Sequence, residues 1–318
     1  MNKKRAKTLQ MMKKCIPIYL MALPGLIYLF INNYMPLPGL VLAFKNYNAR
    51  KGIWGSAWAG LTNFKYLFAT SDAYVITRNT ILYNLAFIVI NTVLSIAVAI
   101  ILSELKKKIK NFYQSVILLP HLISAVIISY IVFAFLSTES GFFNNTMRRL
   151  FGTEPIAWYA EKKYWPFILI FVSAWKSVGY QCIIYLATLL GFDRSFYEAA
   201  ELDGCNHTQI FFKITLPLIR PILSYTMITS LIGGLQMFDV PQILTNGTGD
   251  PARNTMTLIM YLNKHLYSKN YGMAGALSVY LFIISGILCF VVYRMMNDDD
   301  ADGSKAAAKK AKKAARKG

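Results

Sequence analysis

The residues able to carry chemistry in this chain are few, and they do not converge on a catalytic set. Its three histidines, His121, His207 and His265, stand far apart and fall on different predicted surfaces. Its four cysteines have no metal-ligand spacing, so we interpret them as packing residues without a disulfide or a bound metal. The chain also lacks the pattern G-x-x-x-x-G-K-[ST], whose backbone cradles ATP phosphates. If this protein does ATP-driven work, the ATPase must therefore be a separate chain.

Polar and ionisable side chains within strongly apolar stretches form a second group of candidates. Lys176 and Asp239 are ionisable, and charges inside a membrane are costly enough to indicate function by default. Asn84 and Asn91 are seven residues apart, so they share one face of a helix. Hydrogen-bonding and aromatic neighbours complete the set: Tyr180, Gln181, Gln236 and Phe238. We predict that this set lines a substrate path; the alternative for each member is a helix–helix hydrogen bond or a place at the end of a span.

Two further features have packing roles as their first interpretation. His121, beside Pro120, is predicted to be a packed hydrogen-bonding residue and not a proton relay. The Gly233-Gly234 pair is predicted to allow close helix packing, with a hinge as the alternative.

The composition excludes several classes of protein. The 318 residues include 34 Lys and Arg but only 15 Asp and Glu, which gives a net charge of +19. Charged residues nevertheless make up only 15% of the chain and hydrophobic residues 55%, whereas a soluble domain carries about 25% charged residues. This balance excludes a soluble enzyme, a disordered protein and a disulfide-stapled secreted domain. Because the basic charge gathers at the two ends, beside apolar stretches, it indicates contact with membrane lipid and not with nucleic acid.

Six stretches are long and apolar enough to cross a bilayer, which takes about 20 residues each. They predict an all-α integral membrane protein with six transmembrane helices, within residues 15–44 (a helix over about 16–34), 81–102, 114–136, 165–190, 218–244 and 271–293. The predicted organisation is a basic cytosolic N-terminus over 1–14, a transmembrane domain over 15–295 and an Ala/Lys-rich cytosolic tail over 296–318. We expect the tail to be disordered or a transient surface helix.

The basic residues also predict how the spans are oriented in the cell membrane. Six crossings place both termini on one side. With the N-terminus inside, 21 Lys and Arg lie on the inner side and 12 on the outer side, which favours two cytosolic termini. The outer segment 35–80 contains Trp54, Trp58 and Tyr66, and we expect it to be interfacial or folded.

The inner loop between the fourth and fifth spans, residues 191–221, contains two predicted helix starts. At the first, Ser195 is followed three residues later by Glu198, which fits a capping box. It predicts a short helix over about 196–203. Gly204 suits the left-handed position that ends such a helix.

The second helix start repeats the same pattern. Asn206 is followed by Gln209, which predicts a helix through about Ile214. Pro217 and Pro221 are then predicted to stop that helix and to begin the next span.

Small and acidic side chains stand together in the first predicted helix of this loop and just after it. The small ones let another protein approach the backbone closely, and the acidic ones stand on an otherwise basic inner face: Ala199, Ala200, Gly204 and Cys205, with Glu198, Glu201 and Asp203. Such an element can transmit a push from a partner protein into the spans. The residues alone leave a second interpretation open, an amphipathic connector that lies on lipid.

The loop resembles the EAA motif of the permeases of binding-protein-dependent ABC importers. The matching residues are Glu198, Ala199, Ala200, Asp203, Gly204, Ile214, Leu216, Pro217 and Pro221. Cys205 departs from the motif, where Ala is usual, but it is also small. The resemblance implies that this loop is the coupling helix region, in which Glu198 meets the groove of an ATPase subunit.

Other stretches resemble the carbohydrate branch of that family, the maltose-type permeases. Residues 118–124 (LLPHLIS) and 236–249 (QMFDVPQILTNGTG) do so, as does the Asn79-Thr80 step, which is expected to open the second span. Residues 24–47 and 60–64 resemble the oligo- and polysaccharide subgroup. The substrate implied is a sugar or oligosaccharide, and the predicted path offers the hydrogen-bonding and aromatic groups that a sugar needs.

The resemblance also implies partners and a division of labour. A second homologous permease pairs with this chain, two ABC ATPase subunits bind ATP and magnesium, and an extracellular solute-binding protein delivers the sugar. This chain then binds no cofactor and is not an enzyme. The alternatives are an ion-coupled secondary transporter or another polytopic membrane protein, including an enzyme. An ion-coupled transporter would want several intramembrane carboxylates or an inverted repeat, and we see no such repeat.

Overall fold

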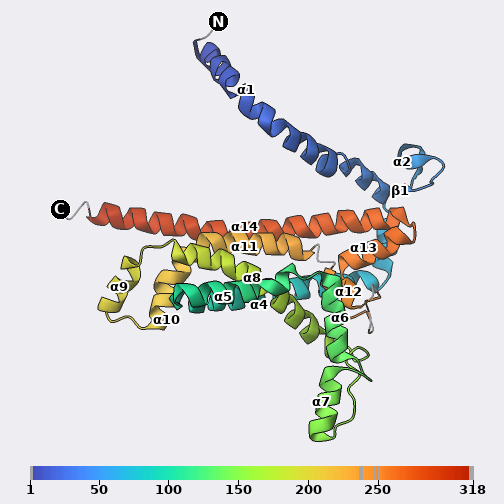
Figure 1. Cartoon of the computed structure of the whole chain (residues 1–318). Helices are drawn as coiled ribbons and strands as arrows, with labels where there is room; N and C mark the ends of the chain where they lie inside the picture. The colour runs from blue at the N-terminus through green and yellow to red at the C-terminus, as the bar shows by residue number, and fades with distance from the viewer. Residues whose placement is uncertain (1–2, 236–238, 246–247, 250, 252, 315–318) are drawn as a thin grey trace.

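The chain folds into a bundle of long helices that run side by side, with shorter elements at both ends (Figure 1). The computed structural model describes residues 3–314, apart from 236–238, 246–247, 250 and 252. The long helices are α4 (Asp72–Glu104), α8 (Trp165–Leu190), α11 (Leu216–Leu235) and α14 (Tyr271–Ala314). Among the described residues, five helices are long and apolar enough to cross a membrane, or six if one bent pair is a single span. The prediction of a helical multi-pass membrane protein is confirmed.

The predicted span boundaries are right for some helices and wrong for others. The prediction 165–190 coincides with α8 at both ends. α4 begins earlier than predicted, at Asp72, so Asn79 and Thr80 lie inside it and do not open it. Both side chains are buried, and Met256, just before α13 (Leu258–Tyr267), and Leu258, at its start, supply their partners, which is why polar residues extend this helix beyond its apolar part. The tail is described as a helix, because α14 continues through Ala314.

The first span stands apart from the bundle. α1 (Lys3–Leu29) and the π turn η1 (Phe30–Tyr34) cover the predicted helix 16–34. Figure 1 shows α1 leading away from the other helices, and no residue in its most apolar window is buried. The chain returns to the bundle through the 3-10 helix η2 (Leu37–Phe44), which packs against α14.

The predicted third span, 114–136, is not one straight helix. α5 (Lys107–Leu122) and α6 (Ala125–Leu136) meet at a bend of 94°, and Figure 1 shows α6 leaving the bundle at a steep angle before α7 (Phe142–Phe151). Pro120 lacks an N–H in the last turn of α5, and Ser124 caps α6 by accepting from the backbone N–H of Ile127 at 3.4 Å. Both halves are apolar, so hydropathy alone could not reveal the break.

Close backbone contacts and apolar clusters hold the bundle together. α4 packs along α8 and also contacts α11, α13 (Leu258–Tyr267) and α3 (Thr62–Ala69). Near one end of α8, Tyr185 and Leu186 are fully buried against Ala99 of α4 and Ile219 of α11.

The two glycines of the pair in α11 have different surroundings. A Cβ at Gly234 would overlap the side chain of Asn84, whereas Gly233 has nothing within 4 Å. This contact supports the packing interpretation of the pair.

The segment before α4 is folded, which is one of its two predicted states. Strand β1 (Lys45–Asn46) pairs antiparallel with β2 (Ala57–Trp58), and α2 (Gly52–Gly55) lies between them. The buried Lys45 ammonium donates to the carbonyl oxygens of Ile53 and Trp54, both at 2.9 Å. This lysine therefore holds the hairpin closed by satisfying two backbone acceptors.

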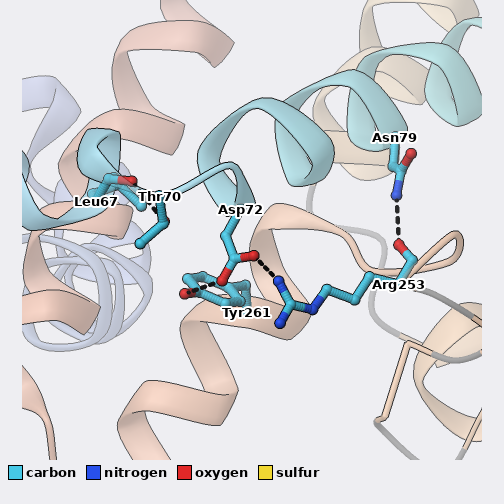
Figure 2. A network of polar contacts seen from close by, with 6 residues as sticks. All are labelled: Leu67, Thr70, Asp72, Asn79, Arg253 and Tyr261. Atoms are coloured by element: carbon cyan, nitrogen blue, oxygen red, sulfur yellow. Dashed lines mark hydrogen bonds and ion pairs between the residues drawn. The ribbon is translucent and has the colours of Figure 1, made fainter.

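A polar network fixes the loop between α12 (Asp239–Leu244) and α13 onto the beginning of α4 (Figure 2). Asp72 forms an ion pair with Arg253 and accepts from the Tyr261 hydroxyl at 2.9 Å. Asn79 donates to the carbonyl oxygen of Arg253 at 3.0 Å. Arg253 has a φ of 57°, which a non-glycine residue rarely adopts, and these contacts on both its side chain and its backbone hold it there.

Gly179→Ala should separate α5 from α8. A Cβ at this position would overlap the carbonyl oxygen of Ile117, a backbone atom that cannot move unless α5 moves. Overpacking of this kind costs about 1–3 kcal/mol, so we expect a lower midpoint of thermal unfolding for the purified protein in detergent. Gly233→Ala is the matched control and should keep the wild-type midpoint. Equal midpoints for the two variants would contradict this packing.

Candidate functional site

The predicted coupling loop projects from one end of the bundle. It consists of α9 (Ser195–Leu202), α10 (His207–Ile210) and the π turn η3 (Phe211–Thr215), and it joins α8 to α11 (Figure 1). At the opposite end of the bundle lie α6, α12 and α13 (Figure 1). The length of α8 therefore separates the loop from the opposite end of the bundle.

The first predicted capping box does not form. Ser195 lies inside α9, and its side chain makes no capping hydrogen bond. Instead, the Asp193 carboxylate accepts from the backbone N–H of Ser195 at 3.0 Å. An acceptor two residues earlier satisfies the free N–H group at the helix start, so the serine is not needed as a cap.

The end of α9 forms as predicted. Gly204 has a φ of 76°, the left-handed conformation expected at this position. Its N–H donates to the carbonyl of Glu201, and the N–H of Cys205 donates to the carbonyl of Ala200, both at 3.0 Å. These two bonds make a Schellman motif, which also places the exposed Asp203 just before the glycine.

The second capping box forms, but the helix after it does not stop at the prolines. Asn206 and Gln209 each accept from the other's backbone N–H, at 2.8 and 3.0 Å. α10 then continues through η3 into α11 as one helical span from His207 to Leu235. The prediction that Pro217 and Pro221 stop a helix is therefore wrong. The wider hydrogen bonding of the π turn, in which Leu216 donates to Phe211, accommodates Pro217 in the turn that follows.

The remaining residues of the motif sit where the loop joins the bundle. Ile214 and Leu216 are half-buried, and Leu216 packs against the cluster that joins α4, α8 and α11. Pro217 is exposed. Their packing is the physical connection between the loop and α11.

α9 presents two different faces. One face closes a cavity of about 520 Å³ between the loop and the ends of α4 and α8. Glu198 and Glu201 line this cavity, together with Arg194, which precedes α9, and Glu104 of α4. Ala200 is buried, so of the two alanines in the motif only Ala199 is open to a partner.

The other face of α9 is apolar and exposed, which the sequence reasoning missed. Leu202 is 89% exposed and Phe196 54% exposed, and Ala199 lies between them in sequence. The spacing i, i+3, i+6 puts these three residues on one side of the helix. The signal was present in the sequence, but only the helical register separates this face from the acidic one.

The predicted substrate path divides into two groups, and the first lies at the bend between α5 and α6. The ammonium of Lys176 donates to the carbonyl oxygen of Ile123 at 3.3 Å, where α5 ends before the bend. One turn further along α8, the half-exposed ring of Tyr180 stacks on His121 of α5 at 4.6 Å between centroids. The buried Nδ1 of His121 has no hydrogen-bond partner among the described residues. His121 thus joins this group, although the sequence suggested only packing.

The second group lies between helices. Gln181 links Ser95 of α4 and Ser230 of α11, at 3.4 and 3.2 Å. Asn84 donates to the carbonyl oxygen of Leu231 at 3.1 Å, and Asn91 donates to Ser173 at 3.4 Å. Both asparagines are buried, and these contacts support the helix–helix alternative for them.

Gln236 and Phe238 lie outside the described residues, and Asp239 is described only as the first backbone position of α12. Within the part of the chain that the structure describes, no three His, Cys, Asp or Glu side chains form a group able to hold a metal ion.

The chain matches the family of binding-protein-dependent transport system inner membrane components over residues 91–298. The polygalacturonan/rhamnogalacturonan transport system permease protein YteP of Bacillus subtilis (strain 168) is 29% identical over 288 residues, which cover 90% of this chain and 89% of that protein. The lactose transport system permease protein LacF of Rhizobium radiobacter is 30% identical over 240 residues, 74% and 80% of the two chains.

A solved structure has the same fold. One chain of a bacterial alginate ABC transporter, in complex with an alginate pentasaccharide-bound periplasmic protein, superposes with a TM-score of 0.79 at 25% identity, over 90% of this chain and 96% of that chain. The family match covers α8, the α9–α10 loop, α11 and the apolar part of α14. The chain is a transport subunit, and it belongs to the family of binding-protein-dependent transport system inner membrane components, the permeases of ABC importers.

Proposed function

We propose that this permease carries a sugar or oligosaccharide into the cell. The observation that carries the proposal is the nature of its relatives, which are named for lactose and for polygalacturonan or rhamnogalacturonan, and of its structural neighbour, which is named for alginate. Their substrates differ in charge and length, but all are saccharides. We therefore propose the class of substrate and not one member of it.

We propose six crossings with both termini in the cytosol. In this arrangement α5 and α6 count as one bent span, and the α9–α10 loop lies on the inner side. The excess of basic residues at the predicted inner ends supports it. The end of the bundle with α6, α12 and α13 then faces outward, where a binding protein would dock.

We propose that α9 docks on an ABC ATPase subunit, one of two that bind ATP and magnesium. An apolar side chain as exposed as Leu202 indicates a partner surface in a loop that lies in water. Glu198 is exposed and lies four residues before Leu202, next to it on the helix surface, where it can pair with a cation of the ATPase. The complete importer also contains a second homologous permease, for which the exposed apolar surface of α1 offers a contact, and an extracellular solute-binding protein.

We propose that the substrate passes the bend between α5 and α6. Lys176, Tyr180 and His121 offer a donor and a stacked aromatic pair there, near the middle of α8. A sugar can hydrogen-bond to the first and stack on the second.

Purification of the tagged permease from its native membrane tests the assembly. An ATPase and a second membrane chain should come with it, and the reconstituted complex should take up radiolabelled saccharide only with the binding protein and ATP. Uptake of sugar by the permease alone would instead indicate a secondary transporter.

Glu198→Ala should weaken the contact through which the permease stimulates its ATPase. Because the side chain is exposed and distant from the bundle core, insertion and expression should be unchanged. Uptake and sugar-stimulated ATP hydrolysis by reconstituted importer should both fall about tenfold or more, as expected when a partly buried charge contact worth about 1.5–3 kcal/mol is lost. Glu154→Ala, which changes an exposed glutamate in the predicted outer loop, is the matched control. Normal coupled transport by Glu198→Ala would remove this residue from the coupling surface.

Gly204→Val should impair coupling more than Gly204→Asn. Valine in the left-handed conformation costs about 1–2 kcal/mol or more, whereas asparagine tolerates it. The valine variant should therefore disturb the Schellman motif and reduce ATPase copurification, and the asparagine variant should retain it. Equal retention of the ATPase by both variants would show that the geometry of this turn is unimportant for docking.

Tyr180→Ala should slow uptake without disturbing assembly. The half-exposed ring stacks on one side only, so its removal leaves the helix contacts of α8 largely intact. We expect uptake to fall about tenfold, the equivalent of about 1.4 kcal/mol of sugar stacking. Tyr225→Ala, which removes an exposed tyrosine from α11, serves as the control in the same uptake assay. Unchanged uptake by Tyr180→Ala would move the sugar path elsewhere.

A further inference from the structure

A second cavity, of about 450 Å³, opens at the end of the bundle opposite α9. It lies between α6, the start of α8, and the end of α12 with the residues that follow it. Its volume is within the range of about 300–1,000 Å³ that small-molecule sites occupy. None of the functional residues discussed above lines it.

Three aromatic rings form one wall of this cavity. The ring of Tyr159 meets Trp165 edge-on at 5.3 Å and Phe133 at 5.8 Å between centroids. Trp165 is fully buried, and its indole N–H donates to the carbonyl oxygen of Tyr159 at 3.1 Å. Because Trp165 is locked in this way, the wall is preformed.

The polar groups of the cavity are hydroxyls. Ser129, Thr245 and Thr248 each donate to a carbonyl oxygen of their own turn, at 2.8, 2.7 and 2.7 Å. Their protons are used in these bonds, and the oxygens of Ser129 and Thr245 keep lone pairs that can accept from a ligand. The Tyr159 hydroxyl makes no hydrogen bond within the described residues. Burial raises its pKa to about 12, so it remains a neutral group that can donate.

This combination fits one class of ligand. A sugar ring has an apolar face that stacks on aromatic rings and hydroxyls that donate to oxygen acceptors. No Asp, Glu, Lys or Arg side chain lines the described part of the cavity, so an ionic group would find no counter-charge. The walls therefore suit the neutral face of a sugar and not its carboxylate.

The cavity is separate from the proposed path at the bend. Trp165 begins α8, and Tyr180 lies 15 residues further along it, about 22 Å at the rise of an α-helix. One sugar ring cannot touch both places. Only a saccharide of several rings, or successive positions of a smaller one, would occupy the two.

We propose that this cavity is an outer sugar subsite, which receives one ring of the incoming saccharide before it reaches Tyr180. The proposal rests on the proposed function, because the sugar substrate and the outward orientation both come from it.

Protection of an introduced thiol tests the subsite in the complete importer. Ser129→Cys is made in a background where Cys15, Cys205 and Cys289 are replaced by Ala; Cys182 is fully buried and can stay. The importer is reconstituted with its binding protein, and a membrane-impermeant maleimide is added outside. Lactose, arabinotriose and trigalacturonate are the probes, and uptake of each is measured in the same proteoliposomes.

We expect a probe that is taken up to slow the labelling of Ser129→Cys about tenfold, the protection given by a competing ligand at about ten times its dissociation constant. Ser140→Cys is the matched control, an exposed serine in the same outer region but outside the cavity, and its labelling should not change. Adding Tyr159→Phe, which keeps the ring and removes the free hydroxyl, should weaken the protection.

The outcomes separate the subsite from the proposed function. If a probe is taken up but labelling of Ser129→Cys is unchanged, the subsite is wrong and the sugar importer stands. Equal protection of Ser140→Cys, or no labelling of Ser129→Cys without sugar, also overturns the subsite. If none of the three saccharides is taken up, the proposed function fails and the subsite fails with it.

Discussion

The bundle depends on how α4 satisfies polar side chains away from water. Lipid gives helices no hydrophobic reason to associate with one another, so close packing and interhelical hydrogen bonds must hold them. α4 supplies such bonds along its length: Thr80 accepts from Leu258 of α13, Asn84 donates to α11, and Ser95 donates to the carbonyl oxygen of Val178 in α8. One helix thereby fixes the positions of α8, α11 and α13. α8 carries residues of both proposed sugar positions, and the coupling loop joins α8 to α11.

This constraint explains why intramembrane polarity is ambiguous as a sign of function. The sequence does not distinguish Asn84, Asn91 and Gln181 from Lys176 and Tyr180, since all are polar or amphipathic residues within apolar spans. The structure separates them by their partners. The first three are used between helices, whereas Tyr180 keeps half of its surface free and Lys176 meets the carbonyl at a break in the backbone.

The sequence predicts those parts of the fold whose signals are local. α8 was placed correctly because apolar residues fill it from end to end, and the turn at Gly204 and the Asn206–Gln209 box follow from residue type and spacing. Ser195 was misassigned because Asp193 competes for the same N–H. The bend at residues 123–124, the early start of α4 and the two faces of α9 depend on tertiary contacts or on helical register, which hydropathy does not contain.

α8 connects the two ends at which this permease is proposed to meet its partners. Trp165 lines the outer cavity, and Leu189 and Leu190 line the cavity behind α9, so one helix of 26 residues, about 39 Å long, touches both. Gly179 allows α5 to pack directly on its middle, and buried side chains join it to α4. A closely packed helix of this kind moves as a rigid element and not by bending. Displacement of the coupling loop would therefore shift the outer cavity with it, and the break between α5 and α6 is where the neighbouring span can accommodate that shift.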